Sequence, residues 1–452
     1  MNVQSINEQF KIAYVSLGCK VNLYESMAII DEFVNNGFIL VSNDELADVY
    51  IVNTCTVTQT SDSKSRKKIR ELARLNPNAI LCVMGCYSQL NPEEALDIDG
   101  VNIVTGTSNR NKLYEEVINL LQTKEYDKKI DLSQSYDDIS CYEELKINKF
   151  YDRTRGFVKI QDGCENFCSY CAIPYSRGKF RSRDKDNIIQ EIQKLTDDGI
   201  KEIVLTGINT GAYGFDLDNY NFANLLTDLC EKVNNLGRLR ISSIEATEVN
   251  DELLQVMKKY EDHFCMHLHI PIQSATDEVL KLMSRKYDLA FYKNVIKNVR
   301  SYFPLINITS DILTGFDGET DELFKEGLEN IRSIEYGETH VFPYSPRSNT
   351  KAYKLSKENK HKYDVNDLVK KYRVSELLSL NEINSLKYRE LFLDKEVCVL
   401  VERIKDGFAT GHSSNYLEIK FKVKNAKVND FVVVKITKVG YPTSMGEEVY
   451  VK

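Results

Sequence analysis

The chain has 452 residues, of which 42% are hydrophobic and 28% charged, and its formal net charge is −8. This length exceeds one ordinary hydrophobic core, so we expect two or three domains, and the composition is ordinary for a folded soluble protein. The acidic balance excludes a protein that is basic over its whole surface, although local basic patches can still contact nucleic acid.

The first residues, MNVQSINEQF, contain neither a basic run nor an apolar run, so they do not resemble a signal peptide. No stretch approaches the roughly 18 apolar residues of a membrane helix, and we therefore expect a cytoplasmic protein with no membrane partner. Eleven cysteines are informative in that setting, because disulfides are disfavoured in a reducing cytosol and the number is odd. Catalytic or metal-binding thiols are the favoured interpretation.

Short apolar runs alternate with helical patterns across the first predicted domain, 11–121. The runs cover 12–17, 49–53 and 80–84, and the helical patterns cover 24–36 and 62–75. This alternation predicts an α/β fold with a parallel sheet. The polar segment that follows, 122–152, has little apolar periodicity, and we expect it to be a linker.

The pattern restarts in the second predicted domain, 153–385. Six strands are predicted there, at 156–162, 202–208, 239–245, 267–273, 306–316 and 339–344. Helical windows separate them, as at 187–198, so the region consists of six βα units. Six units predict a partial (β/α)6 barrel rather than a closed eight-stranded one.

The third predicted domain, 386–452, changes period. Leu417, Ile419, Phe421 and Val423 alternate with charged residues, which predicts a small antiparallel β-barrel. From residue 394 onward the chain carries ten Lys and Arg against eight Asp and Glu, so this tail is mildly basic.

Three cysteines lie just after the first predicted barrel strand. Cys164, Cys168 and Cys171 form a Cys-x3-Cys-x2-Cys array in GCENFCSYC. A zinc site normally has four ligands, and no fourth Cys or His lies nearby in sequence. Three thiolates on a four-iron cluster would leave one iron open to a bound molecule, and barrel enzymes build their sites on such loops. The alternatives are a three-cysteine zinc loop or chance thiols.

A second set of cysteines is spread over the first domain. Cys19, Cys55 and Cys86 each follow one of its three predicted strands. Because the carboxyl ends of parallel strands share one edge of a sheet, these thiols are expected to lie close together. One alternative is that these three cysteines are only small apolar residues of the core, and another is a ligand set that includes Cys82. Cys82 lies within the run ILCVM, however, and is expected in the core.

The array at 164–171, with Tyr170 before its last cysteine, resembles the radical S-adenosylmethionine (SAM) signature. With the second cysteine set and the β-barrel tail, the chain from about 11 to 452 is similar to the methylthiotransferases. The resemblance implies two [4Fe-4S] clusters, the SAM-binding one on Cys164, Cys168 and Cys171 and an auxiliary one on Cys19, Cys55 and Cys86. It also implies that SAM is a cofactor and that the tail is an RNA-binding TRAM domain. One SAM would supply a methyl group to sulfur, and a second would yield the radical that abstracts hydrogen from the adenine ring.

Shorter motifs bear on the substrate. The segments LGCKVNLYES (17–26), NTCTVTQTSDSKSRKKIR (53–70) and GCYSQ (85–89) are similar to the MtaB group, which modifies N6-threonylcarbamoyladenosine beside the tRNA anticodon. Partners implied are the tRNA anticodon stem-loop and an electron donor such as flavodoxin or ferredoxin. The alternatives are a methylthiotransferase for isopentenyladenosine tRNA or a ribosomal protein, and a non-catalytic iron–sulfur RNA-binding protein.

Polar residues follow the predicted barrel strands. The resemblance implies that some of them contact SAM, as Tyr170 does; the candidates are Tyr170, Thr206, Gly207, Asn209, Ser243, Glu245, Gln273 and Asp311. Any one of them could instead satisfy a backbone group. His267 and His269 alternate with apolar residues, which favours core or supporting histidines over metal ligands.

Three basic runs are candidates for RNA phosphate contacts. The first, KSRKKIR (64–70), includes Lys64, Arg66 and Lys67 and closely follows Cys55. The second contains Arg177, Lys179 and Arg181, and the third contains Lys420, Lys422 and Lys424, which alternate along a predicted barrel strand. The alternative for each run is a solvated face.

Overall fold

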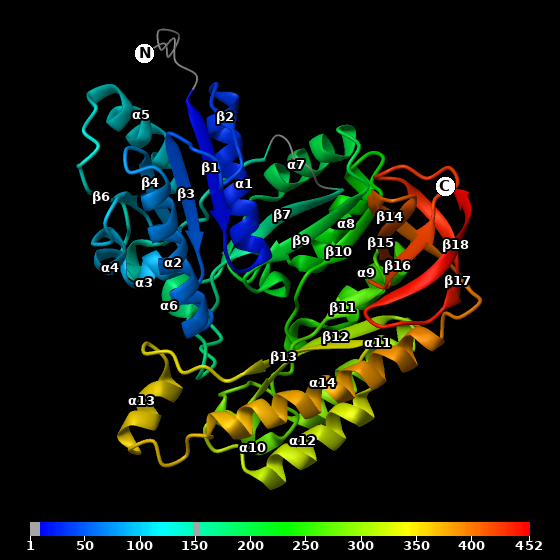
Figure 1. Ribbon diagram of the computed structural model, residues 1–452. Coiled ribbons are helices and arrows are strands. Elements are labelled where there is room, and N and C mark those ends of the chain that lie inside the picture. Colours follow the sequence, from blue (N-terminus) through cyan, green and yellow to red (C-terminus); the bar gives the residue numbers. More distant parts are fainter. Residues whose placement is uncertain (1–9, 148–153) are drawn as a thin grey trace. The chain divides into compact units, whose positions relative to one another are not determined.

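The computed structural model describes residues 10–147 and 154–452 (Figure 1). The chain divides into two compact units. Unit 1 consists of Met1–Phe150, Gln161–Arg183 and Ser345–Thr350, and unit 2 consists of Tyr151–Ile160, Asp184–Tyr344 and Lys351–Lys452. Residues 148–152 of the predicted linker and residue 153 of the predicted barrel domain lie outside the described residues.

A six-stranded parallel sheet forms the centre of unit 1, in the order β2-β1-β3-β4-β5-β6. Every residue of the central strands β3 and β4 is buried, as expected for parallel strands with both faces covered. This confirms the predicted parallel α/β sheet. The strands are β1 (Lys11–Ser16), β2 (Ile39–Leu40), β3 (Val49–Thr54), β4 (Ile80–Gly85), β5 (Val101–Val104) and β6 (Ile130–Asp131).

The helices of unit 1 differ in burial: most residues of α1 are buried, whereas α2 has a narrow buried stripe. On α2, Ser65, Ile69 and Leu72 are the buried residues, at helical spacing, and Thr58 caps the helix by accepting a hydrogen bond from the Ser61 amide. The helices are α1 (Lys20–Asn35), α2 (Gln59–Leu75), α3 (Cys86–Leu90), α4 (Pro92–Leu96), α5 (Leu113–Thr123) and α6 (Ile173–Arg177).

The described part of the predicted linker, 122–147, makes specific contacts with unit 1. Strand β6 pairs with β5 at the edge of the sheet. Glu143 forms an ion pair with Arg110 at 2.6 Å, and the buried Leu145 accepts a hydrogen bond from the Tyr24 hydroxyl through its carbonyl. These are single long-range contacts, which apolar periodicity does not reveal. The predicted domain boundaries themselves stay predictions.

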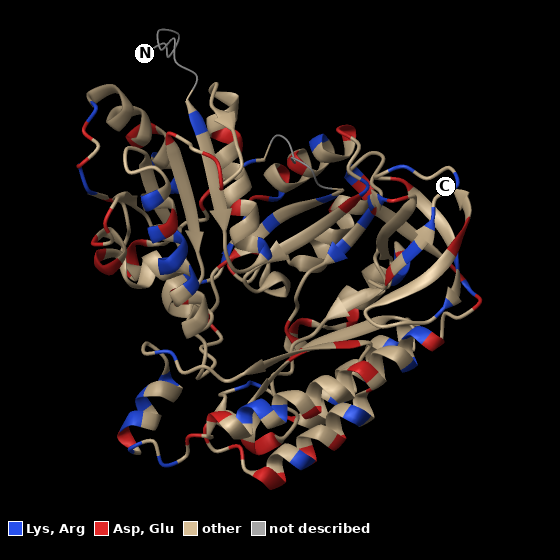
Figure 2. Ribbon diagram, in the orientation of Figure 1, with Lys and Arg blue, Asp and Glu red and all other residues tan. Residues whose placement is uncertain are grey.

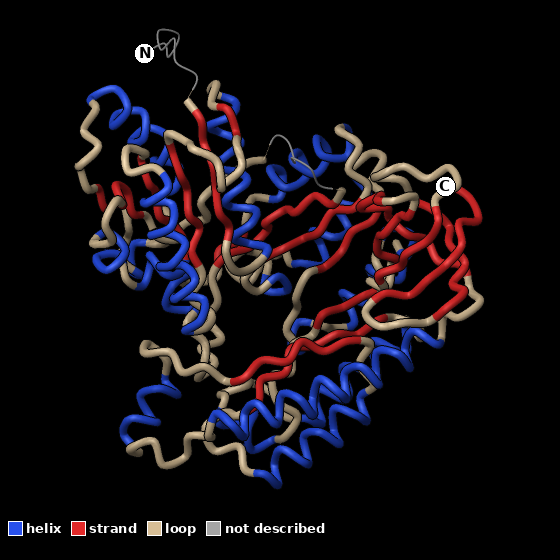
Figure 3. The backbone as a smooth tube through the Cα atoms, in the orientation of Figure 1, coloured by secondary structure: helices blue, strands red, loops and turns tan. Residues whose placement is uncertain are grey.

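The six predicted barrel strands are all present, as β7 (Arg155–Asp162), β9 (Glu202–Gly207), β10 (Arg238–Ile241), β11 (His267–His269), β12 (Asn307–Thr314) and β13 (Glu338–Pro343). They form two sheets, β10-β9-β7-β8 and β11-β12-β13, where β8 is Arg181–Ser182 (Figure 3). Isolated bridges, Leu239 to Phe264 and Ser243 to His269, continue the pairing from β10 toward β11. The predicted partial barrel is thus confirmed.

Helices accompany the barrel strands of unit 2. They are α7 (Lys185–Asp197), α8 (Phe222–Lys232), α9 (Asp251–Lys259), α10 (Asp277–Leu282), α11 (Leu289–Tyr302), α12 (Asp321–Ile334), α13 (Lys351–Glu358) and α14 (Asp367–Glu390). Among the helices of the two described stretches, none combines the length and the apolar character needed to cross a membrane.

Five strands close into a small barrel at the carboxyl end, in the order β14-β15-β16-β18-β17. Val399, Ile419 and Phe421 are in its core, and the alternation of buried and exposed residues along β16 confirms the predicted pattern. Asp406 and Gly407 both have positive φ, which suits the tight hairpin that joins β14 to β15. The strands are β14 (Glu396–Lys405), β15 (Phe408–Ser413), β16 (Glu418–Lys422), β17 (Phe431–Lys438) and β18 (Thr443–Val451).

Candidate metal centre

Cys19, Cys55 and Cys86 follow three neighbouring strands of the unit 1 sheet. Cys19 occupies the N-cap position of α1 after β1, Cys55 comes directly after β3, and Cys86 begins α3 directly after β4. Because β1, β3 and β4 are adjacent and parallel, the three residues lie at one edge. Cys55 and Cys86 are buried and Cys19 is exposed. Cys82 is fully buried within β4, as the sequence predicts.

The backbone before Cys19 lies against Cys55. A Cβ atom added to Gly18, whose φ is +99°, would lie 2.8 Å from the Cys55 Sγ atom. Burial raises the pKa of Cys55 to about 11, and negative charge on Cys86 and on Cys19 raises it further. Thiolates crowded in this way are stabilised by a bound cation, because metal ligation requires the deprotonated sulfur. This donor set therefore fits a metal cluster.

Asn22 joins the loops that carry Cys19 and Cys55. Its side-chain amide donates to the carbonyls of Leu17 at 2.7 Å and of Thr54 at 2.9 Å. Beside Cys55, the Arg347 guanidinium donates to the Thr56 hydroxyl at 2.6 Å and the Asp62 carboxylate at 2.5 Å. The sequence motifs contained Asn22 without showing this role, and no local signal pointed to Arg347.

Cys164, Cys168 and Cys171 also belong to unit 1, in the loop between β7 and α6. The Cys164 amide donates to the Gly178 carbonyl at 3.0 Å, and the Cys171 amide donates to the Cys168 carbonyl at 3.0 Å. These three cysteines and Tyr170 are half-buried. None of the eleven cysteines, all within the described residues, is in a disulfide. Three reduced thiols in one folded loop fit the open-iron cluster that the sequence predicts.

Two of the residues predicted to contact RNA are buried beside these loops, and the prediction is wrong for both. Arg177 is fully buried and lies 3.3 Å from Cys86 Sγ through its Nε atom. Arg181 is also buried, and its guanidinium lies 3.6 Å from the Asp162 carboxylate. A buried, paired guanidinium has no face for a phosphate. Their partners are remote in sequence or on another strand, so the basic run alone suggested a surface strip.

Most residues predicted to contact SAM lie at or after the ends of strands in unit 2. Thr206 and Gly207 end β9, Asn209 follows it, Ser243 and Glu245 follow β10, Gln273 follows β11, and Asp311 lies within β12. The Asn209 amide donates to the Glu248 carboxylate at 2.6 Å, and Arg285 pairs with Glu245 at 2.6 Å. The main-chain N–H of Gln273 donates to the main-chain carbonyl of Asp311 at 3.0 Å. The sequence interpretation missed Glu248 and Arg285.

Burial and then the charge of Glu245 raise the pKa of Glu248 to about 8. Its hydrogen-bond partner Asn209 is an amide rather than a cation. At neutral pH the carboxyl group is therefore largely protonated and can donate as well as accept a hydrogen bond.

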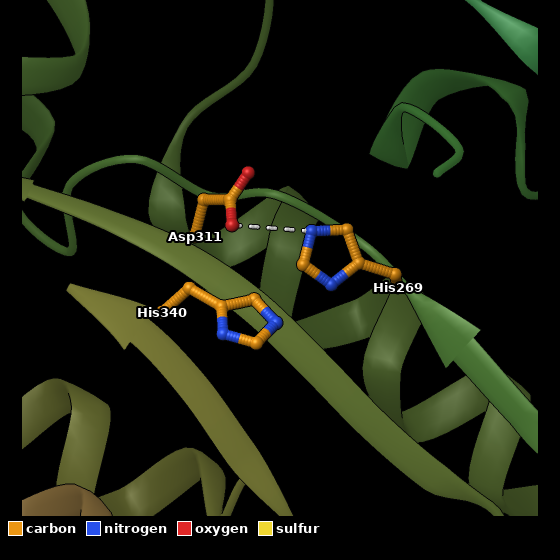
Figure 4. Close-up of side chains that lie close together, drawn as sticks. All are labelled: His269, Asp311 and His340. Atoms are coloured by element: carbon orange, nitrogen blue, oxygen red, sulfur yellow. Dashed lines mark ion pairs between the residues drawn. The ribbon is translucent and has the colours of Figure 1, made fainter. Parts of the chain in front are cut away.

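Three polar side chains lie close together on the sheet β11-β12-β13 (Figure 4). His269 of β11, Asp311 of β12 and His340 of β13 bring ligand-type atoms within 4.8 Å of one another, and His269 Nε2 lies 3.3 Å from Asp311 Oδ1. The Thr309 hydroxyl contacts His269 Nδ1 at 2.8 Å and His267 Nε2 at 2.9 Å. His267 is buried as predicted, whereas His269 faces the Asp311 carboxylate.

The other basic candidates lie at the surface, and Lys and Arg recur along α2 (Figure 2). Lys64, Lys67 and Lys179 are exposed, and Arg66 is half-buried over the Tyr87 ring and 3.5 Å from Glu94. In the small barrel, Lys420 and Lys422 are exposed on β16. Lys424 lies beyond the end of that strand, and its ammonium donates to the Glu448 carbonyl at 2.8 Å. The predicted three-lysine strand is therefore a two-lysine strand.

Comparison with known proteins agrees with this arrangement. Residues 158–331 match the family described as Radical SAM superfamily, and residues 11–106 match Uncharacterized protein family UPF0004. The chain is 41% identical to the threonylcarbamoyladenosine tRNA methylthiotransferase MtaB of Bacillus subtilis, covering 97% of this chain and 96% of that protein. It is 33% identical to the tRNA-2-methylthio-N(6)-dimethylallyladenosine synthase of the same species, covering 95% and 86%.

A solved structure supports the fold alone. The radical S-adenosylmethionine methyltransferase TsrM of Kitasatospora setae, with cobalamin and a [4Fe-4S] cluster bound, superimposes with a TM-score of 0.55. The sequence identity is 13%, and the match covers 77% of this chain and 78% of that one. The cysteine loops, the barrel and the full-length similarity lead to one assignment. The chain belongs to the radical SAM methylthiotransferase family, among its MtaB-like members.

Proposed function

We propose that this protein transfers a methylthio group to the adenine ring of N6-threonylcarbamoyladenosine in tRNA. Two sets of three thiols in one compact unit carry the chemical part of the proposal. The substrate is supported by 41% identity to a relative named for threonylcarbamoyladenosine, against 33% for the dimethylallyladenosine relative of the same species. Isopentenyladenosine tRNA, a ribosomal protein and a non-catalytic role are not favoured.

The thiols have separate roles in this proposal. Cys164, Cys168 and Cys171 hold the cluster that binds SAM, with Tyr170 beside them, and Cys19, Cys55 and Cys86 hold the auxiliary cluster. When bound, the clusters and SAM supply the radical and the methylthio group. The chain itself orients the groups: Asn22 joins two of the auxiliary loops, and the main-chain hydrogen bonds of Cys164 and Cys171 shape the loop of the SAM-binding cysteines.

Unit 2 supplies the proposed SAM contacts, which are Thr206, Gly207, Asn209, Ser243, Glu245, Gln273 and Asp311. SAM carries a cationic sulfonium, which a carboxylate attracts by charge, and an amino group, which can donate a hydrogen bond to Glu245 or Asp311. Cations at the surface are proposed to contact tRNA phosphates: Lys64, Arg66, Lys67, Lys179, Lys420, Lys422 and Lys424. The electron donor would be a flavodoxin or ferredoxin, and the site of action the cytoplasm.

Iron content and nucleoside analysis test the proposal. Anaerobic reconstitution should give about eight irons per chain, and Cys164→Ala, Cys168→Ala and Cys171→Ala together should leave about four. Mass spectrometry of tRNA from a deletion strain should show loss of the 2-methylthio group from N6-threonylcarbamoyladenosine only. Loss of the 2-methylthio group from isopentenyladenosine instead would show that isopentenyladenosine is the substrate. A fully loaded protein that releases no 5′-deoxyadenosine from SAM under dithionite would favour the non-catalytic alternative.

A further inference from the structure

Arg177 lies where the two cysteine sets of unit 1 meet. It is the last residue of α6, six positions after Cys171, and its Nε atom donates to Cys86 Sγ at 3.3 Å. Nη1 donates to Glu25 at 2.6 Å and to Asp162 at 3.2 Å, and Nη2 donates to Asn22 at 2.7 Å and to Glu25 at 3.0 Å. A guanidinium has five N–H donors, and each of the five has an acceptor here.

The pocket fixes the direction of the guanidinium. Both oxygens of the Glu25 carboxylate accept hydrogen bonds from Arg177, in the bidentate geometry that only arginine offers. Glu25 is itself held from the other side by Arg110 Nη1 at 2.6 Å. Arginine stays protonated in proteins, and the carboxylates of Glu25 and Asp162 both pair with the Arg177 guanidinium. The residue is therefore a permanent cation aimed at one sulfur.

A cation beside a cluster ligand has a defined electronic effect. Hydrogen bonds to ligand sulfurs and nearby positive charge stabilise the more negative, reduced cluster, and so raise its reduction potential. The low dielectric constant of the interior strengthens this effect, because the guanidinium is fully buried. Asn22, which ties together the loops of the other two auxiliary cysteines, binds the same guanidinium. One side chain thus reaches all three auxiliary loops, directly or through one amide.

We infer that Arg177 is a positioning residue for the auxiliary cluster: it holds Cys86 against the loop of the SAM-binding cysteines and raises the reduction potential of the cluster that Cys86 ligates. The inference rests on the ligand sets of the proposed function. It assigns to an arginine of the stretch Gln161–Arg183 a role at a cluster whose ligands lie in Met1–Phe150.

The test isolates the auxiliary cluster in the full-length chain with Cys164, Cys168 and Cys171 changed to Ala. In this background, the midpoint potential is measured by electron paramagnetic resonance during an anaerobic redox titration, with iron counted in each sample. Arg177→Gln should shift the potential to more negative values. Arg177→Lys should shift it less, because lysine keeps the charge but loses the bidentate hydrogen bonds of the guanidinium. Arg110→Gln is the matched control, since it disturbs the same Glu25 without a bond to sulfur.

Each outcome bears on the inference. An unchanged potential in Arg177→Gln at full iron content overturns it, and so does an equal shift in Arg110→Gln. If Arg177→Gln loses its iron while Arg110→Gln retains it, the positioning role is supported, and loss in both variants overturns it. If the parent of these variants binds no cluster at all, the ligand set of the proposed function fails instead.

Discussion

Arg177 and Lys422 carry the same charge and do different things because their surroundings differ. Arg177 is fully buried, and carboxylates, an amide and a thiol surround its five donors. Lys422 is exposed on a barrel strand and lies opposite Glu447 on the neighbouring strand. A buried cation with fixed partners organises the protein around it, whereas an exposed cation is available for a mobile polyanion. Position in the fold, rather than the run of charges, decides which of the two roles a cation takes.

The contact between Gly18 and Cys55 gives the largest effect that we predict. Gly18→Ala should cost the auxiliary cluster, because the new Cβ would lie 2.8 Å from Cys55 Sγ and the backbone has φ of +99°. Iron content after reconstitution should fall from about eight to about four per chain. Gly37→Ala is the control, since its φ is +97° but nothing lies within 4 Å of the added atom. Full iron in both variants would show that the two loops tolerate the contact.

The ion pairs of the buried region should contribute far more than surface pairs of the same unit. Glu25→Gln leaves Arg110 and Arg177 without their shared carboxylate, and should lower the free energy of unfolding by about 3–5 kcal/mol. Glu94→Gln breaks the exposed pair with Arg66 and should cost about 0–1 kcal/mol. Urea titrations under anaerobic conditions give both values. Similar losses in the two variants would contradict the distinction between buried and exposed cations.

Two buried glutamates of unit 2 extend the comparison to carboxylates. Despite burial, Arg240 and Arg238 lower the pKa of Glu202 to about 2, whereas burial and Glu245 raise that of Glu248 to about 8. The raised pKa means that the folded protein binds the Glu248 proton more tightly than the unfolded chain does. The stability from this group is complete below about pH 4.5 and is lost as pH rises toward 8, at up to about 1.4 kcal/mol per pH unit.

Replacing Glu248 with Gln removes this titration. The unfolding free energy of Glu248→Gln, measured between pH 5 and 8, should therefore fall less steeply with pH than that of the wild type. The depressed pKa of Glu202 has the opposite sign, and its contribution is lost only as pH falls from about 4.5 toward 2. Parallel pH profiles for wild type and Glu248→Gln would mean that Glu248 is ionised in the folded protein.

The exposed lysines should give the smallest effect. Lys420→Gln with Lys422→Gln should weaken tRNA binding and flatten the dependence of log affinity on log salt by up to about 1.4, for two contacts with single-stranded RNA. Lys424→Gln should do less, because its ammonium already donates to the Glu448 carbonyl. Affinity is measured across a salt series, with SAM cleavage as a control that should persist. Superimposable titrations would show that this strand is only a solvated face.

Much of the fold could be predicted because the central strands of unit 1 are buried on both faces and stand out as apolar runs, whereas the barrel strand β16 alternates buried and exposed residues. The grouping of Cys19, Cys55 and Cys86 followed from strand ends alone. The role of Arg177 could not be predicted, since Glu25 lies more than a hundred residues away and only the fold brings the two together. Lys424 was misjudged because the alternating pattern continues past the last paired residue of β16. Periodicity shows which face a residue occupies, but neither its partner nor where pairing stops.

Unit 1 is assembled from three separate stretches of chain, and this has a consequence for biosynthesis. The ribosome makes Cys19, Cys55 and Cys86 first, yet Arg177 comes later and Arg347, which binds Thr56 beside Cys55, later still. A nascent chain that ends between residues 171 and 347 carries all six thiols but lacks Arg347 beside Cys55. Cluster insertion into a finished pocket must therefore wait until most of the protein has been translated, which leaves the thiols to be protected from oxygen during that interval.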